Sequence, residues 1–322
     1  MKIVILGAGR IGGSLARNLS KSNYQVLIVD QNKDRLSDLE DKLDIMTVEG
    51  NASSLLTLKK SGLDEDTIVI AVTSNDDANI IACQISKNAF SVKKTICRFK
   101  DDSYINQLDI FGEGIIDIPI SPENEVTSHL IELIKHPGAE QIEEFAEGKV
   151  KLVSVKAKKK GKLVGRELKH IKDDIPNVDA YIPSIYRKGK PFIPQGDTVI
   201  KENDEVYFIS SEANIEPIVE EFRNHEDSYS RIMIVGGGKI GFSLAKDLEK
   251  TYKVKLIDSN ADRCSSLSRD LEKTIVLCGS ATDESLLKSE NIANIDLFCA
   301  LTNDDETNVM SSLLAKKMGA KK

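Results

Sequence analysis

The chain has 322 residues, of which 40% are hydrophobic and 30% are charged, and its formal net charge is −7 at pH 7. These values are ordinary for a soluble protein of two or three domains. No apolar run approaches the ~20 residues that a membrane span needs. The acidic balance excludes nucleic acid as an expected partner, since phosphate backbones are bound by basic surfaces.

The chain opens with the pattern of a phosphate-binding loop. An apolar run at 2–6 predicts a strand, and G-x-G-x-x-G follows it, formed by Gly7, Gly9 and Gly12. Gly7 permits the tight turn out of the strand, Gly9 lets the backbone approach a pyrophosphate, and Gly12 lets the next helix pack on the sheet. A phosphate is favoured there by the free N–H groups and the dipole of the helix N-terminus.

Apolar runs then alternate with helical patterns, which predicts a parallel sheet with helices on both faces. The expected strands are 2–6, 25–29, 45–48, 67–72, 94–99 and 115–118, and the expected helices are 10–21, 32–43, 52–61, 76–89 and 103–110. We therefore expect a Rossmann-like, doubly wound α/β domain over residues 1–122. Because glycines rather than a cleavage site follow the first run, we interpret it as a buried strand and expect a cytoplasmic protein.

Other candidate site residues lie where ligands bind in such sheets, beyond the carboxyl ends of the strands. Asp30 ends the second strand, where a carboxylate can accept both hydroxyls of an adenosine ribose and repel a 2′-phosphate, so NAD or another adenine nucleotide is favoured over NADP. The further candidates of this copy are Arg10, Ile11, Asn51, Ala52, Thr73, Asn75 and Arg98. Arg10 could lie over a phosphate or be a solvated arginine. Asp76 and Asp77 could cap the next helix, or touch the ligand or a cation.

Residues 123–146 follow as a helix, ended by Pro137-Gly138, and a short second segment. We interpret this region as a linker helix, with apolar residues at helical spacing that contact another subunit. Residues 147–225 alternate strand-like runs with turn signals and close with a helix at 212–223, which predicts a small α+β domain.

The first pattern recurs at the end of the chain. IVILGAGRIGGSL (3–15) matches IMIVGGGKIGFSL (232–244), and IVIAVTSNDDANIIACQ (68–84) matches LFCALTNDDETNVMSSL (297–313). Shared elements over this length indicate a duplicated domain, here 231–322. Its candidate site residues are Gly236, Gly238, Lys239, Ile240, Gly241, Asp258, Ser280 and Thr302. This copy stops after its fourth strand and helix, so we expect a truncated sheet with an open edge and lower stability. An empty site is the alternative for each copy.

No catalytic or metal-ligating set is evident. The four histidines, at positions 129, 136, 170 and 225, all lie outside the two glycine-loop domains. A dehydrogenase would need an acid–base residue near its cofactor, so an NAD-dependent oxidoreductase is the alternative to a binding protein. The five cysteines show no Cys-x-x-Cys spacing, and we expect buried thiols.

The domain order and several segments resemble a known family. FAEGKVKLVSVKA, IYRKGKPFIPQGDTVIKENDEVYFI and TNDDETNVMSSLLAKKMGAKK are similar to the TrkA family of potassium-uptake regulatory subunits, whose RCK (KTN) domains alternate with small TrkA-C domains. The resemblance covers the whole chain. It implies a ring-forming homo-oligomer, a dimer or tetramer, on the inner face of the cell membrane.

The resemblance also implies a function. Such a subunit binds NAD(H), with ATP or ADP as further ligands, and gates a TrkH-like membrane potassium transporter. Gly7, Gly9, Gly12, Asp30, Asn51 and Thr73 would line its first nucleotide site. A structural ring component without a ligand is a third reading.

Overall fold

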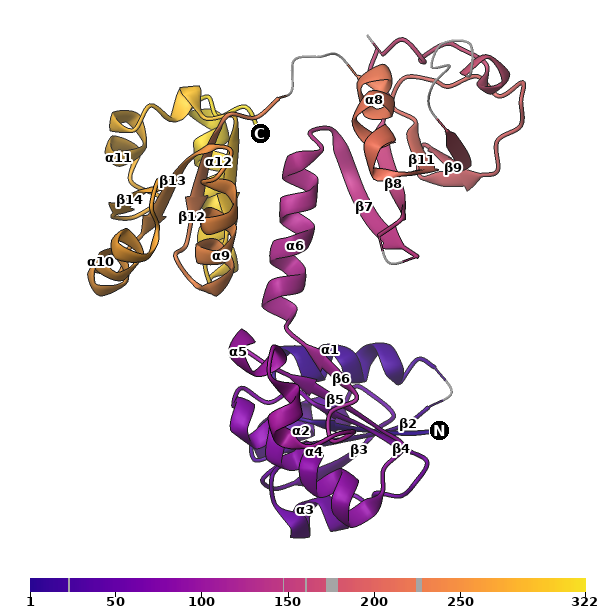
Figure 1. The fold of residues 1–322 in the computed structure, drawn as a ribbon, viewed down its shortest axis with the longest axis vertical. Helices are drawn as coiled ribbons and strands as arrows, with labels where there is room; N and C mark the ends of the chain where they lie inside the picture. The colour runs from indigo at the N-terminus through magenta and orange to yellow at the C-terminus, as the bar shows by residue number, and fades with distance from the viewer. Residues whose placement is uncertain (23, 147, 160, 172–178, 224–227) are drawn as a thin grey trace. The chain divides into compact units, whose positions relative to one another are not determined.

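The structure is a computed structural model that describes residues 1–22, 24–146, 148–159, 161–171, 179–223 and 228–322 (Figure 1). The chain divides into two compact units, Met1–Glu123 and Asn124–Lys322. Positions 147 and 225, where the expected α+β domain begins and ends, and His225 itself lie outside the described residues.

The first unit is an α/β domain with a six-stranded parallel sheet of order β3-β2-β1-β4-β5-β6. Its elements are β1 (Lys2–Leu6), α1 (Arg10–Leu19), β2 (Gln25–Asp30), α2 (Lys33–Glu40), β3 (Met46–Glu49), α3 (Leu55–Lys60), β4 (Thr67–Ala71), α4 (Asp76–Phe90), β5 (Lys94–Arg98), α5 (Asp102–Ile105), η1 (Leu108–Phe111) and β6 (Ile118–Ile120). The doubly wound arrangement predicted for this region is confirmed.

Each face of this sheet carries its own core, because successive side chains of a strand point to opposite faces. Val4 and Leu6 of β1 lie in the cluster that contains Leu58 of α3 and Ile80 of α4. Ile5 of β1 lies in the other cluster, with residues of α1 and α2. Continuous apolar runs form these strands because both faces are buried.

The second unit begins in α6 (Pro122–Lys135) and continues into an antiparallel sheet of order β10-β9-β11-β8-β7. Its elements are β7 (Ala139–Phe145), β8 (Val150–Lys156), η2 (Leu168–His170), β9 (Ala180–Arg187), β10 (Lys190–Phe192), β11 (Glu205–Ser210) and α8 (Glu212–Phe222). Phe208 of β11 and Phe222 of α8 are fully buried in its core.

The linker expected over 123–146 needs correction. Only its first part is helical, since residues 139–145 form β7, which pairs with β8 from Ala139 to Phe145. The apolar stripe of α6 is largely covered within the described residues. Leu130 and Ile134 belong to the hydrophobic cluster around Ile232, and Leu133 packs against the core of the antiparallel sheet, whereas Val126 is exposed. The stripe therefore no longer argues by itself for a contact with another subunit.

A second parallel sheet closes the described chain, with the order β14-β13-β12-β15. Its elements are β12 (Arg231–Val235), α9 (Lys239–Leu248), β13 (Lys253–Asp258), α10 (Ala261–Asp270), β14 (Ile275–Cys278), α11 (Glu284–Ser289), η4 (Ile292–Asn294), β15 (Leu297–Ala300) and α12 (Asp305–Lys317). The order matches β3-β2-β1-β4 of the first sheet, as the sequence repeat predicts. Within the described ranges, no helix is long and apolar enough to cross a bilayer.

Candidate functional site

The first glycine loop joins β1 to α1, and each of its three glycines meets a different demand. Gly7 has a φ of +110°, and a Cβ there would lie 3.1 Å from the Thr73 backbone. At Gly12 a Cβ would overlap the carbonyl oxygen of Gly7. At Gly9, the N-cap of α1, a Cβ would meet nothing within 4 Å. The loop is therefore closed toward the sheet and open above Gly9, where a phosphate needs space.

Asp30 lies at the carboxyl end of β2, beside this loop. Its Oδ2 accepts a hydrogen bond of 2.6 Å from the Ala8 N–H, and its Oδ1 accepts one of 2.8 Å from the Asn32 N–H. Each carboxylate oxygen has a second lone pair, so the group can still accept hydroxyl protons of a ribose. The acid therefore holds the loop and stays available to a ligand.

Thr73 follows β4 at the same edge of the sheet and is fixed by Asn79. The Thr73 N–H and hydroxyl donate to Asn79 Oδ1 at 2.9 and 2.7 Å, and Asn79 Nδ2 donates to the Arg98 carbonyl at 3.0 Å. Asn79 is fully buried. It joins the ends of β4 and β5 and so fixes the Thr73 backbone that Gly7 approaches.

The helix that follows is capped by Asn75, whose side chain accepts from the Ala78 N–H at 2.8 Å. The sequence-based assignment of the cap to Asp76 or Asp77 is wrong. Asp76 instead accepts from the N–H groups of Lys100 and Asp101, at 2.8 and 2.9 Å. It therefore anchors the loop after β5.

Arg98 ends β5 and its guanidinium is mostly buried. Its Nη2 donates to Glu123 at 2.6 Å, and its Nη1 lies 3.5 Å from the Thr73 carbonyl. Asn51 uses its side chain to hold Ser53, and Ala52 is buried. Arg98 and Asn51 are therefore both engaged in contacts within the first unit.

Arg10 and Ile11 form the first turn of α1. Arg10 is exposed and Ile11 half-buried. An exposed arginine therefore begins the helix directly after Gly9.

The second glycine loop repeats this geometry between β12 and α9. Gly236 has a φ of +97°, and a Cβ on it would lie 2.7 Å from the Leu301 carbonyl oxygen. A Cβ on Gly241 would overlap the Gly236 carbonyl oxygen, whereas one on Gly238 would be free. Lys239 and Ile240, the first residues of α9, are both half-buried.

Asp258 of the second copy is more enclosed than Asp30. It is 5% exposed and accepts from the Gly237 N–H at 2.7 Å, the Asn260 N–H at 2.8 Å and Arg263 Nη1 at 3.2 Å. Burial alone would raise the pKa of Asp258, but these three donors hold the pKa below its ordinary value. The carboxylate is therefore charged, and one of its oxygens is already occupied by an arginine.

Thr302 and Asn308 repeat the pair formed by Thr73 and Asn79. The Thr302 N–H and hydroxyl donate to Asn308 Oδ1 at 2.9 and 2.8 Å. Ser280 is exposed and hydrogen-bonds Thr282. The repeated segments 68–84 and 297–313 align Asn79 with Asn308, but the sequence analysis did not place either asparagine in a site. Each asparagine follows a threonine at the same spacing in the sequence, and this repeated spacing could have identified the pair as part of the site.

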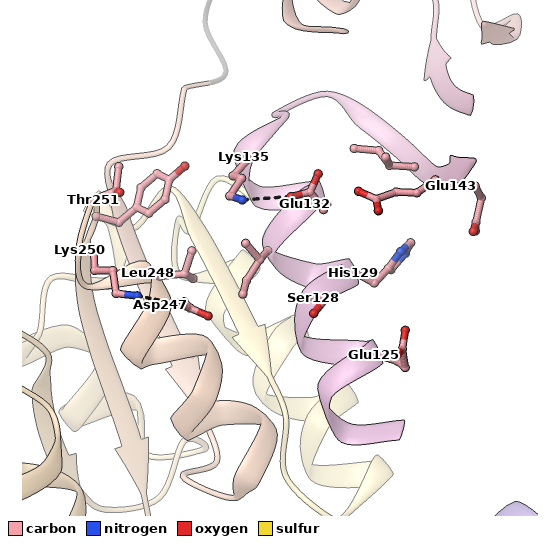
Figure 2. A pocket seen from close by; sticks show the side chains of 14 residues that line it. Glu125, Ser128, His129, Glu132, Lys135, Glu143, Asp247, Leu248, Lys250 and Thr251 are labelled. Carbon is pink, nitrogen blue, oxygen red and sulfur yellow. Dashed lines mark hydrogen bonds and ion pairs between the residues drawn. The ribbon is translucent and has the colours of Figure 1, made fainter. Parts of the chain in front are cut away.

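A cleft of about 710 Å³ lies elsewhere in the second unit, lined by α6, β7 and the C-terminal end of α9 (Figure 2). Carboxylates such as Glu132, Glu143 and Asp247 stand there beside Lys135 and Lys250. The glycine loop lies at the opposite, N-terminal end of α9. The cleft is therefore not part of the candidate nucleotide site.

One group of side chains has the composition of a metal site. Ligand atoms of Glu132, His136 and Glu212 lie within 4.8 Å of one another. The ammonium of the buried Lys151 pairs with Glu132, with Glu212 at 2.5 Å and with Glu144 at 3.0 Å. A cation of the chain itself already neutralises these carboxylates, so the geometry does not favour a metal ion there.

Two parallel sheets with glycine loops, each beside an acid at the end of the neighbouring strand, place the chain in the class of Rossmann-type nucleotide-binding folds. The model of the TrkA-N domain matches residues 3–122 and 232–322, and that of the TrkA-C domain matches residues 152–223. The chain therefore belongs to the TrkA family of Trk potassium uptake proteins.

Relatives of known name support this membership. The chain is 47% identical over 324 residues to the Trk system potassium uptake protein TrkA of Halomonas elongata, and 46% identical over 325 residues to that of Vibrio alginolyticus. Each alignment covers all of this chain and 71% of the relative.

Solved structures share the fold. The GsuK RCK domain aligns with a TM-score of 0.70 at 19% identity, covering 98% of this chain and 67% of that one. The GsuK channel bound to NAD aligns with a TM-score of 0.71 at 21% identity, covering 98% and 56%. At these identities the likeness concerns the fold alone.

Proposed function

We propose that the chain is a nucleotide-binding regulatory subunit that gates a membrane potassium-uptake transporter. Its ligand is NAD(H), with ATP and ADP as the alternatives, and its first site is formed by the loop of Gly7, Gly9 and Gly12 together with Asp30 and Thr73. The names of its relatives, which are potassium uptake proteins, support this role. The open N-terminus of α1 beside the Asp30 carboxylate is the observation that carries the proposal.

The geometry of the first copy suits a dinucleotide or adenosine phosphate. A Cβ on Gly9 would meet nothing within 4 Å, so a phosphate can approach the N–H groups of the helix start. Asp30 can accept ribose hydroxyls at the end of β2, where this fold binds that sugar. A 2′-phosphate would meet the same carboxylate, which disfavours NADP.

We infer regulation rather than hydride transfer. All four histidines lie outside residues 1–122 and 231–322, so neither glycine loop has a histidine acid–base partner within its own domain. A nucleotide can bias a transporter only by binding one arrangement of the subunit more tightly than another. The arrangement of the TrkA-N domains is the variable that we propose the nucleotide controls.

The proposal includes assembly and location. A homo-oligomer, a dimer or tetramer, on the inner face of the cell membrane would place several TrkA-N domains against a TrkH-like partner. The solved relatives include a gating ring, the human SLO3 gating ring, which aligns with a TM-score of 0.53. The bounds 1–122 and 231–322 of the two TrkA-N domains remain our prediction. The linker expected over 123–146 is shortened to its helical part, since β7 (Ala139–Phe145) pairs with β8 and belongs to the α+β domain that was expected over 147–225.

The second copy is proposed as a weaker site. Arg263 already pairs with the Asp258 carboxylate at 3.2 Å, so a ribose has to share or displace that arginine. We therefore expect lower affinity there for the same nucleotide, and we expect Asp258→Ala to change total binding less than Asp30→Ala.

Titration calorimetry of the purified full chain with NADH, NAD, ATP and ADP tests the proposal. Asp30→Ala should weaken binding by roughly one to two orders of magnitude, because charge-assisted hydrogen bonds to the ribose are lost. Since Asp30 also holds the Ala8 N–H, the unfolding midpoint of each variant is measured in parallel. Binding of none of the four nucleotides at millimolar concentration would refute the nucleotide site.

Potassium uptake tests the regulatory half. Cells that carry the partner transporter and lack their own regulatory subunit receive either the wild-type chain or Asp30→Ala. Uptake that depends on the wild-type chain and responds to the variant supports gating. Uptake that is the same with and without the chain would overturn it, whatever the calorimetry shows.

A further inference from the structure

Two cysteines of the second copy meet beside its candidate ribose-binding acid. Cys264 lies in the first turns of α10, and its thiol donates to the Asp258 carbonyl oxygen at 3.2 Å. Cys278 ends β14 and is the register partner of Asp258 across the two parallel strands. The backbone of Asp258 therefore has one cysteine beside it in the sheet and another above it on the helix.

The alternation of side chains along β14 brings the two thiols to the same face. Val276 packs in the cluster that includes Leu267 of α10, whereas Leu277 packs on the opposite face, with Leu287 of α11. Cys278, two residues after Val276, therefore points to the face that α10 covers. The Cys278 side chain therefore lies near the Cys264 thiol, and burial together with that neighbour raises the pKa of Cys264 to about 11.

The two thiols differ in access to solvent. Cys264 is buried and Cys278 is exposed, which corrects the expectation that all the cysteines are buried. A reagent in solution can therefore react with Cys278 first, and the buried Cys264 is the neighbouring second thiol. This is the arrangement in which an oxidised cysteine is resolved by a neighbour.

The first copy does not share this pair. Leu36 of α2 occupies the place of Cys264, since both follow the acid by the same number of residues. Glu49, the register partner of Asp30, occupies the place of Cys278. The pair is therefore particular to the second site and is not required by the fold.

We propose that Cys264 and Cys278 form a disulfide on exposure to a peroxide, and that this bond controls nucleotide binding at the second site. In the first step the Cys278 thiolate attacks hydrogen peroxide, which gives a sulfenic acid and hydroxide. The Cys264 sulfur then displaces the sulfenic oxygen, which leaves as water with the remaining protons. In total two thiols are oxidised and one peroxide is reduced to two waters.

The link to the nucleotide follows from the neighbours of Cys264. A disulfide removes the thiol proton that binds the Asp258 carbonyl and ties the start of α10 to the end of β14. Arg263, which precedes Cys264, pairs with the Asp258 carboxylate and moves with the same turn. This half of the inference rests on the proposed nucleotide site, and the disulfide itself does not.

Peptide mapping of the full chain tests the bond directly. The reduced protein is treated with hydrogen peroxide, its free thiols are alkylated, and trypsin separates Cys264–Arg269 from Thr274–Lys288. We expect a linked pair of these peptides that lacks two hydrogen atoms, disappears with a reducing agent, and is absent from Cys264→Ser and Cys278→Ser. Oxidation of Cys278 without the linked pair would overturn the proposal.

The chain contains its own matched control. Cys83 and Cys97 of the first unit are also neighbouring cysteines, but both are fully buried. Peroxide should leave this pair reduced while it links Cys264 to Cys278. Equal linking of both pairs would show that oxidation follows unfolding, which contradicts a reaction of the folded site.

Nucleotide affinity tests the second half. Calorimetry is performed on Gly9→Val, which closes the first site, before and after oxidation. We expect oxidation to weaken ATP or NADH binding by roughly three- to tenfold, the effect of one lost or distorted hydrogen bond. Unchanged affinity with a complete disulfide would refute the control of binding. If the reduced variant binds no nucleotide, the second site of the proposed function fails instead, and the peptide map still decides the disulfide.

Discussion

Substitutions at Gly9 and Gly12 should affect two different properties, the access of a ligand at Gly9 and the stability of the fold at Gly12. Gly9 has φ −70° and ψ −169°, an extended conformation that any residue adopts, and a Cβ there meets nothing within 4 Å. Gly9→Val should therefore cost at most about 1 kcal/mol of unfolding free energy, since valine is a poorer N-cap than glycine. Its branched side chain would nevertheless fill the space above the loop.

Gly12→Ala should instead act first on the stability of the fold. Its Cβ would overlap the Gly7 carbonyl oxygen and lie 3.3 Å from Cγ2 of Ile5. The helix α1 must then move away from β1, and the overlapping atom is backbone, which cannot rotate aside. We expect a loss of roughly 3 kcal/mol or more, at or above the upper range for overpacked cores.

The two variants are compared by urea unfolding and by calorimetry with NADH and ATP. Gly9→Val should lose first-site binding by about 100-fold or more, because at least two charge-assisted contacts to phosphate are excluded, while its unfolding midpoint stays near the wild type. Gly12→Ala should lose both. First-site affinity like that of the wild type in Gly9→Val would refute the placement of the phosphate on this loop. Wild-type stability of Gly12→Ala would refute the described approach of helix and loop.

Three further outcomes are expected. Asn79→Ala should lower the unfolding free energy by roughly 2–3 kcal/mol, because the Thr73 N–H and the Arg98 carbonyl lose a buried partner, and nucleotide affinity should fall with it. Lys151→Met should lower the free energy of unfolding, measured with a chemical denaturant, by about 2–3 kcal/mol; this is less than for a fully buried ion pair, because solvent screens the half-exposed acids around Lys151. An added Glu132→Gln should recover part of the loss. For Asp296, burial would raise the pKa, but donors that include Lys321 hold the pKa well below its ordinary 3.8. The charged carboxylate therefore stabilises the folded protein fully above about pH 5, and this contribution is lost as the pH falls. Asp296→Asn should accordingly flatten the acid limb of a curve of unfolding free energy against pH.

The parallel sheets could be predicted because their signal is local and repeated. Each strand is a short continuous apolar run, and each glycine loop follows such a run directly. Two copies of the same order made the assignment firmer than either alone. The predicted strand at 2–6 and the observed β1 coincide, and the predicted end of the second strand differs from β2 only by Asp30.

The remaining features depend on contacts between distant residues. Residues 139–145 carry four polar side chains and little alternation, so their pairing with β8 was not visible locally. Asn79 looks like a helix residue until β5 brings the Arg98 carbonyl to it. Cys278 lies on the edge strand β14, and its exposure follows from that place in the sheet.

The hydrogen bond from the Ala8 N–H to Asp30 has a consequence for how the first unit can respond to a nucleotide. The acid restrains the glycine loop before any ligand arrives, so binding has little backbone entropy to remove there. A loop that is already held in its binding conformation does not change conformation when a nucleotide binds, so regulation cannot depend on such a change. What differs between the occupied and empty protein must then lie in the charge and bulk that the ligand adds above Gly9, at the exposed Arg10 and the start of α1. The loop then holds the nucleotide in a fixed position, and the surface that contacts the nucleotide from the opposite side responds to its presence.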